Sequence, residues 1–162
     1  GHLVLSTLHT NDAPSAITRL LDLGVPAYLI NSTLLGIMAQ RLVRTLCPHC
    51  KKPVTTDDEH RAAWRSLVAP WKSGEPAQIY QPVGCLECRM TGYSGRVGIY
   101  ELLLNSVEIR RLIKPQMEIA KLREQAYREG MRPLRISGAL KVAQGATSLE
   151  EIIKVAPPAD ET

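Results

Sequence analysis

The chain has 162 residues, of which 44% are hydrophobic, and carries a formal net charge of +4. This length suits one common domain of roughly 100–150 residues, or one such domain and a small module. The composition excludes a fibrous or wholly disordered protein, and no apolar run approaches the roughly 18 residues that a membrane span needs. No signal peptide is visible. The mild basic charge permits contact with an anion such as phosphate but does not require nucleic acid.

The chain opens with an apolar run, from Leu3 to Leu5, that is typical of a strand buried in a parallel sheet. A strand at residue 1 has no earlier neighbour in this sequence, and the chain starts without Met. We therefore expect a fragment of a larger protein. After the strand, Asp12 suits the N-cap of a helix, Pro14 its first turn and Gly24 the residue just past its end.

Two capping boxes mark further helix starts, one from Thr56 to Glu59 and one from Ser148 to Glu151. Glycines and prolines separate the other segments. Strands are predicted at residues 1–10, 42–46, 78–83 and 96–104, and helices at 12–23, 26–39, 57–68, 105–113, 118–129, 133–144 and 148–155, with a disordered tail at 157–162.

All four cysteines lie in two C-x-x-C pairs. Two such turns bring four thiolates to the corners of a tetrahedron, the arrangement that zinc prefers, and leave no open coordination position. The pattern therefore favours a structural Zn²⁺ held by Cys47, Cys50, Cys85 and Cys88. Two disulfides or four free thiols are the alternatives, and His49 is a possible replacement for one cysteine ligand.

Three other segments are candidates for chemistry. Small polar residues and His9 follow the first predicted strand, where open α/β sheets bind ligands, although a His there often only closes a turn. Arg41 and Arg44 are suited either to a phosphate or to solvent. The glycine-rich segment 92–98 indicates a tight backbone path. No G-x-x-x-x-G-K-[ST] phosphate loop occurs anywhere in the sequence.

These segments together resemble one known family, the ATPases that drive bacterial type II secretion and type IV pilus assembly. The resemblance covers residues 1–155 and rests on Gly-His-Leu-Val-Leu-Ser-Thr-Leu-His-Thr-Asn (1–11), Ala-Gln-Arg-Leu-Val-Arg-Thr-Leu-Cys-Pro-His-Cys (39–50), Gly-Cys-Leu-Glu-Cys (84–88) and Thr-Gly-Tyr-Ser-Gly-Arg-Val-Gly-Ile-Tyr-Glu-Leu-Leu (91–103).

The resemblance implies an α/β fold: the C-terminal part of a RecA-like ATPase core with an inserted tetracysteine zinc module and a C-terminal helical subdomain. The implied parts are core strands and helices at 1–46, the zinc module at 47–90, a return strand at 91–104, the helical subdomain at 105–156 and the tail at 157–162.

The resemblance also implies a nucleotide site. Residues 7–10 match the family's His box near the terminal phosphate, and Arg41 lies in the Gln-Arg-Leu stretch beside it. Thr7, His9 and Arg41 are thus the catalytic candidates, and His9, Thr10 and Arg41 the nucleotide-binding ones. The implied cofactors are ATP and Mg²⁺ in the full-length protein, beside the structural Zn²⁺.

The resemblance further implies that the full-length protein is a cytoplasmic homo-hexamer. It would be peripheral on the inner membrane and would work with secretion platform proteins there. The Walker A loop, Asp box and Walker B strand of the family are not in this sequence, so we expect no ATP hydrolysis by this chain alone. The Tyr-Glu-Leu-Leu motif favours the type II secretion branch. Alternatives are a pilus or DNA-uptake motor of the same family, a zinc-ribbon module that binds nucleic acid or protein, and a thiol redox protein.

Overall fold

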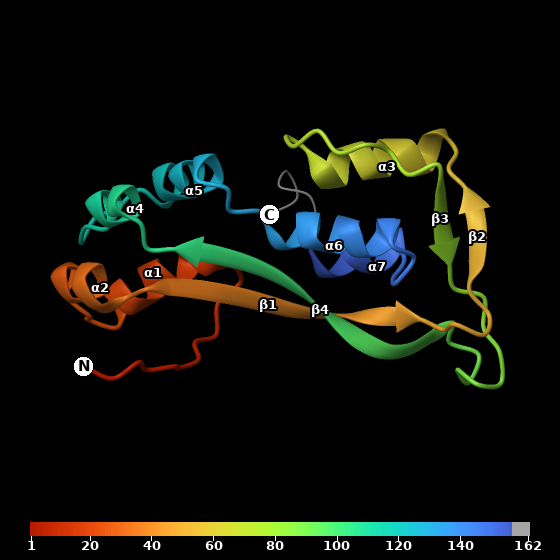
Figure 1. Ribbon diagram of the computed structural model, residues 1–162, viewed down its shortest axis with the longest axis horizontal. Coiled ribbons are helices and arrows are strands. Elements are labelled where there is room, and N and C mark those ends of the chain that lie inside the picture. The colour runs from red at the N-terminus through yellow and green to blue at the C-terminus, as the bar shows by residue number, and fades with distance from the viewer. Residues whose placement is uncertain (157–162) are drawn as a thin grey trace. The chain divides into compact units, whose positions relative to one another are not determined.

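The computed structural model describes residues 1–156 (Figure 1), and their contacts divide the chain into two compact units. Of the described residues, the first unit holds 1–39 and 101–132, and the second holds 40–100 and 133–156. β1 (Gly36–Leu46) pairs with β4 (Tyr93–Leu104) in a two-stranded sheet. Each of these strands contributes residues to both units.

The first unit contains α1 (Ala13–Asp22), α2 (Ala27–Thr33), α4 (Val107–Leu112) and α5 (Ile119–Arg128). As predicted, Asp12 is the N-cap of α1 and accepts a hydrogen bond from the Ser15 backbone N–H at 2.8 Å. Gly24 follows the helix with φ of 85°, a conformation that glycine adopts without strain. The core of this unit is aliphatic and includes Ile17, Ile30, Leu103, Ile109 and Leu122.

The second unit contains α3 (Asp58–Val68), α6 (Leu134–Ala143), α7 (Leu149–Val155) and an antiparallel pair formed by β2 (Lys52–Thr55) and β3 (Gln78–Gln81). In that pair, Lys52 lies opposite Gln81 and Thr55 lies opposite Gln78. Helices α6 and α7 pack closely at Gly138, which has no side chain. A Cβ added there would lie 2.6 Å from Cγ2 of Ile152. Its core includes Val43, Trp64, Leu67, Ile99, Val142 and Ile152.

The predicted opening strand is wrong. Residues 1–10 have no regular secondary structure, and Leu3, Val4 and Leu5 are 73%, 79% and 89% exposed. An extended segment becomes a strand only where its backbone pairs with another strand. Within residues 1–156, the sheets are the two pairs β1–β4 and β2–β3, and neither includes this segment.

The predicted helix 26–39 is too long. Helix α2 ends at Thr33, and β1 begins at Gly36. Pairing with β4 decides the matter: the Asn105 N–H bonds to the Leu35 carbonyl at 3.0 Å, and a Cβ at Gly36 would lie 2.9 Å from the Leu103 carbonyl oxygen. The backbones therefore approach too closely there for a side chain.

The capping box at Thr56 is also wrong. Asp57 is the N-cap of α3 and accepts from the His60 N–H at 2.9 Å, whereas the Thr56 hydroxyl donates to the Pro76 carbonyl at 2.9 Å. Strand β2 was not predicted; it forms because β3 supplies its partner. The remaining predicted helices and strands are confirmed within a few residues. The predicted disordered tail, residues 157–162, lies outside the described residues.

None of the helices in residues 1–156 is both long and apolar enough to cross a membrane.

Candidate metal centre

The four cysteine side chains meet at one place in the second unit, and all four sulfurs lie within 4.8 Å of one another. The Cys47–Cys85, Cys50–Cys88 and Cys85–Cys88 sulfur pairs are 3.9, 3.8 and 3.7 Å apart. The cysteines are free thiols, because a disulfide needs sulfurs only about 2.05 Å apart.

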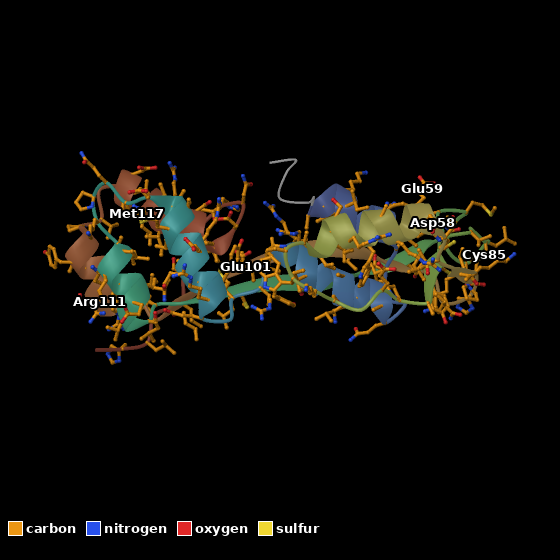
Figure 2. All side chains as sticks on the ribbon, turned by 90° about the horizontal axis from the view of Figure 1, so that it is seen from above. Asp58, Glu59, Cys85, Glu101, Arg111 and Met117 are labelled. Atoms are coloured by element: carbon orange, nitrogen blue, oxygen red, sulfur yellow. The ribbon has the colours of Figure 1, made fainter. Side chains whose placement is uncertain are left out.

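Two tight backbone turns bring these sulfurs together. In the first turn, the Lys51 N–H bonds to the Cys47 carbonyl at 3.0 Å. In the second, which carries Cys85 (Figure 2), the Met90 N–H bonds to the Cys85 carbonyl at 2.8 Å. Arg89 and Met90 both have positive φ, 52° and 64°, a conformation unfavourable for residues with a Cβ. The backbone is therefore strained at these two residues, which connect the second turn to β4.

Backbone N–H groups point at the sulfurs. Gly84 donates to Sγ of Cys50 at 3.3 Å, and both Cys85 and Gly92 donate to Sγ of Cys88 at 3.2 Å. Burial raises the pKa of the Cys88 thiol, but these two donors stabilise the thiolate and bring that pKa to about 6. The turns thus stabilise the deprotonated, metal-binding form of Cys88. At Cys85 a backbone hydrogen bond lowers the pKa, but burial and hydrogen bonds with the other three thiols raise it to about 11.

The sulfur geometry fits a tetrahedral metal ion. Zinc–sulfur bonds of about 2.3 Å place the corners of a tetrahedron about 3.8 Å apart. Three of the sulfur–sulfur separations, 3.7 to 3.9 Å, match that edge, and all of them are within 4.8 Å. Four sulfurs fill the coordination shell, so this centre is suited to a structural role and not to activating a water molecule.

The first turn is attached to the loop between α6 and α7. Next to it, the Leu46 N–H bonds to the Ala146 carbonyl at 2.9 Å. Lys51 Nζ donates to the Gly145 carbonyl at 2.7 Å and lies 4.7 Å from the centre of the Tyr80 ring. The cysteine cluster therefore supports the end of α6 as well as its own loops.

The remaining predicted site residues do not join this cluster. His49 is exposed and is not among the clustered ligands. Thr7 and His9 lie in the irregular exposed segment of the first unit, whereas Arg41 is a half-buried residue of β1 in the second unit.

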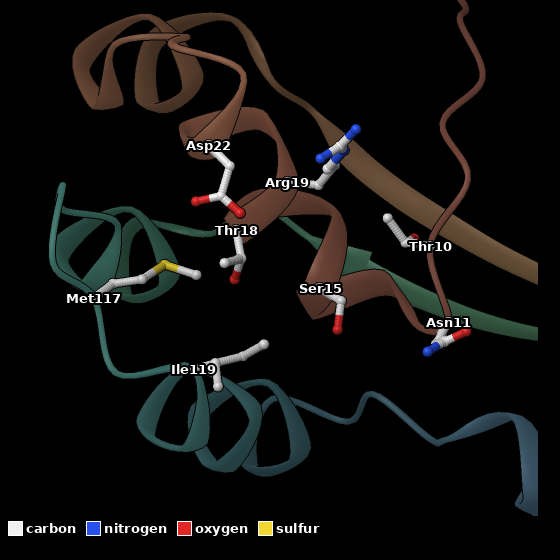
Figure 3. A pocket seen from close by; sticks show the side chains of 8 residues that line it. All are labelled: Thr10, Asn11, Ser15, Thr18, Arg19, Asp22, Met117 and Ile119. Atoms are coloured by element: carbon white, nitrogen blue, oxygen red, sulfur yellow. The ribbon is translucent and has the colours of Figure 1, made fainter.

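Thr10 lines a surface hollow of about 370 Å³ in the first unit (Figure 3), and its hydroxyl donates to the Asp12 carbonyl at 3.0 Å. Polar side chains from α1 form much of its wall, and Met117 and Ile119 close one side. Of the four residues predicted for the nucleotide site, only Thr10 contributes to this hollow.

Sequence reasoning missed Glu101, which is 3% exposed and accepts a hydrogen bond from the Ala13 N–H at the start of α1. The alternation of β4 contained a signal for it. Ile99, Glu101 and Leu103 occupy every second position and all three are buried, so a carboxylate stands where the pattern requires an apolar residue.

Comparison with known proteins shows the family of this chain. A sequence model described as "Type II/IV secretion system protein" matches residues 1–154, and the chain belongs to that family. The chain is 51% identical to the type IV pilus assembly ATPase TfpB of Acinetobacter baylyi over 157 residues. This alignment covers 97% of the chain and 26% of TfpB.

Relatives of both branches of the family are similar to the chain. It is 47% identical to the type II secretion system ATPase E of Vibrio cholerae, over 96% of this chain and 30% of that protein. It is 46% identical to the type IV pilus assembly ATPase PilB of Myxococcus xanthus, over 94% of this chain and 27% of that protein. The chain thus spans between 26% and 30% of the length of these relatives.

Proposed function

We propose that this chain is the C-terminal part of a hexameric ATPase that powers type II protein secretion, where it supplies a structural zinc centre and a segment that contacts nucleotide. The observation that carries the proposal is the four-sulfur cluster, placed on a chain whose family relatives are named as ATPases of secretion and pilus assembly. The RecA-like core, the cytoplasmic location at the inner membrane and the contact with secretion platform proteins belong to the same proposal.

The proposed metal ligands are Cys47, Cys50, Cys85 and Cys88. A bound Zn²⁺ would supply four bonds that cross-link the two turns, without taking part in a reaction. The N–H donors of Gly84, Cys85 and Gly92 would orient the sulfurs and share their negative charge.

The proposed nucleotide residues are Thr7, His9, Thr10 and Arg41. In the full-length protein they would act on ATP bound with Mg²⁺, where phosphoryl transfer depends on positioning and on stabilising the charge of the terminal phosphate. Hydroxyl, imidazole and guanidinium groups are suitable hydrogen-bond donors for that purpose. The present chain alone is proposed to be inactive, because the sequence contains no phosphate-binding loop.

Steady-state ATP hydrolysis by the full-length protein tests this function. We expect His9→Ala to lower kcat by about 100- to 1000-fold, the range for one lost hydrogen-bond donor to the transition state. The 162-residue chain should show no hydrolysis above background. Full activity of His9→Ala, or hydrolysis by the short chain, would contradict the proposal.

Pilus assembly is the second candidate function, because TfpB at 51% and PilB at 46% identity are about as similar to this chain as the secretion ATPase at 47%. Genetic complementation separates the two. The full-length gene should restore protein export in a strain without its type II secretion ATPase. Restoration of pili alone would instead assign the chain to the pilus branch.

A further inference from the structure

Glu101 joins two parts of the first unit that are far apart in sequence. It lies on β4 (Figure 2), 88 residues from Ala13, and its Oε1 accepts the Ala13 backbone N–H at 2.8 Å. Ala13 is the first residue of α1 and has no carbonyl four residues earlier in the helix to receive its N–H. The buried carboxylate of Glu101 therefore completes the first turn of α1.

A second carboxylate, that of Asp12, binds the same turn. Asp12 Oδ1 accepts the Ser15 N–H at 2.8 Å, and Asp12 Oδ2 pairs with Nη2 of Arg123 on α5. The start of α1 is thus attached to β4 through Glu101 and to α5 through Asp12. The segment just before it is attached as well, because the Thr10 hydroxyl donates to the Asp12 carbonyl.

This arrangement decides where an anion can bind. A free helix N-terminus attracts phosphate through its unpaired N–H groups and its partial positive charge. Here the N–H groups of Ala13 and Ser15 already have carboxylate acceptors, so a phosphate at that position would meet two negative charges. Contact of this segment with phosphate is therefore left to the residues that precede the helix, among them the exposed His9.

We propose that Glu101 is a positioning residue, which fixes the start of α1 and thereby sets the place of His9 toward the terminal phosphate of a nucleoside triphosphate. The proposal rests on the function proposed above. Glu101 is the one buried carboxylate in residues 92–104. The sequence suggested no chemistry for this segment, and the proposal gives Glu101 a role in it.

The test is a double-mutant cycle for ATP hydrolysis in the full-length protein. Glu101→Ala should lower kcat by about tenfold or more with little change in KM, because a displaced donor weakens the transition state more than nucleotide binding. Glu101→Gln should retain most of the activity, since its amide oxygen can still accept the Ala13 N–H. The double variant Glu101→Ala, His9→Ala should have the same kcat as His9→Ala alone, because Glu101 acts through His9.

Two further variants separate positioning from folding. Arg123→Ala removes the other attachment of Asp12 from a side chain that is 37% exposed, and it should reproduce part of the loss. Glu108→Ala removes an acidic residue, 52% exposed, whose pair with Arg111 lies on the surface, and it should leave kcat unchanged.

The outcomes distinguish the two proposals. If His9→Ala has full activity, the proposed nucleotide role fails and the role of Glu101 fails with it. If His9→Ala is impaired but Glu101→Ala is fully active, the positioning role is wrong and the proposed function stands. The same holds if Glu101→Ala lowers kcat by the same factor in the His9→Ala background as in the native protein.

Discussion

Arg44 on β1 and Glu151 on α7 lie 107 residues apart in the sequence and form a three-point contact. The Arg44 backbone N–H donates to Oε1 of Glu151 at 3.0 Å, while Nε and Nη2 donate to Oε2 at 2.9 and 2.6 Å. The guanidinium also lies 4.0 Å from the centre of the Tyr93 ring, and the Tyr93 hydroxyl lies 2.7 Å from that of Ser148. This network fastens the start of α7 to the strand that leads into the first cysteine turn.

Removing the carboxylate of this network should destabilise the second unit. Glu151→Ala leaves the partly buried Arg44 N–H without its acceptor, so we expect a loss of about 1–3 kcal/mol in the free energy of unfolding. Arg44 is 45% exposed, which keeps the loss in the lower half of that range. Chemical denaturation of the 162-residue chain measures it, and Glu150→Ala, at an exposed neighbouring position, is the matched control. Equal stabilities for the two variants would contradict the prediction.

The same carboxylate makes stability depend on pH. The hydrogen bonds from the Arg44 side chain lower the pKa of Glu151 below its ordinary value of 4.5, although burial opposes them. A lowered folded-state pKa adds stability above the ordinary value, and this stability is lost as the pH falls through the lowered one. The difference in unfolding free energy between the native chain and Glu151→Gln should therefore shrink between pH 6 and pH 3, roughly as the carboxylate takes up its proton. A constant difference across that range would show that the charge of Glu151 is not the cause.

Metal removal should unfold the second unit. Structural zinc sites of this type bind with about 10–16 kcal/mol, which is comparable to the net stability of a whole domain. We expect one zinc ion per chain by elemental analysis, and a chelator should lower the thermal transition of the native chain. In the double variant Cys47→Ser and Cys50→Ser, the chelator should have no further effect. A native chain without zinc, or one insensitive to chelation, would rule out the metal centre.

Packing between α6 and α7 gives a further prediction. A methyl group at position 138 would lie 2.6 Å from Cγ2 and 2.9 Å from Cδ1 of Ile152. Gly138→Ala should therefore cost about 1–3 kcal/mol through overpacking, despite a gain of up to about 1 kcal/mol in helix propensity. Gly74→Ala, where an added Cβ meets no atom within 4 Å, should be neutral. Because Ile152→Ala removes the side chain that the new methyl group meets, the double variant should lose less unfolding free energy than the sum of the two single variants. Losses that simply add would contradict the steric explanation.

Local signals predicted the helices well. Asp12 and Ser148 cap their helices as the sequence indicates, because an N-cap depends on atoms within a few residues of each other. The box at Ser148 is realised only in part: Ser148 accepts the Glu151 N–H at 3.2 Å, but the Glu151 carboxylate binds Arg44 instead of turning back to the cap. A long-range ionic partner therefore outcompetes the local one.

By itself, the sequence determined the helix starts at Asp12 and Ser148 and the grouping of the cysteines into two turns, since these depend on spacings of three or four residues. Tertiary structure alone decided that β1 replaces the end of a predicted helix, that residues 1–10 stay irregular, and that Glu101 and Glu151 are buried acceptors. Each of those outcomes depends on a partner between 70 and 107 residues away, or on the lack of one among residues 1–156. The alternation of β4 indicates that Glu101 is buried, but it does not say which group the carboxylate binds. A hydrogen bond to a distant strand or helix depends on the folded chain, so only the tertiary structure reveals the partner.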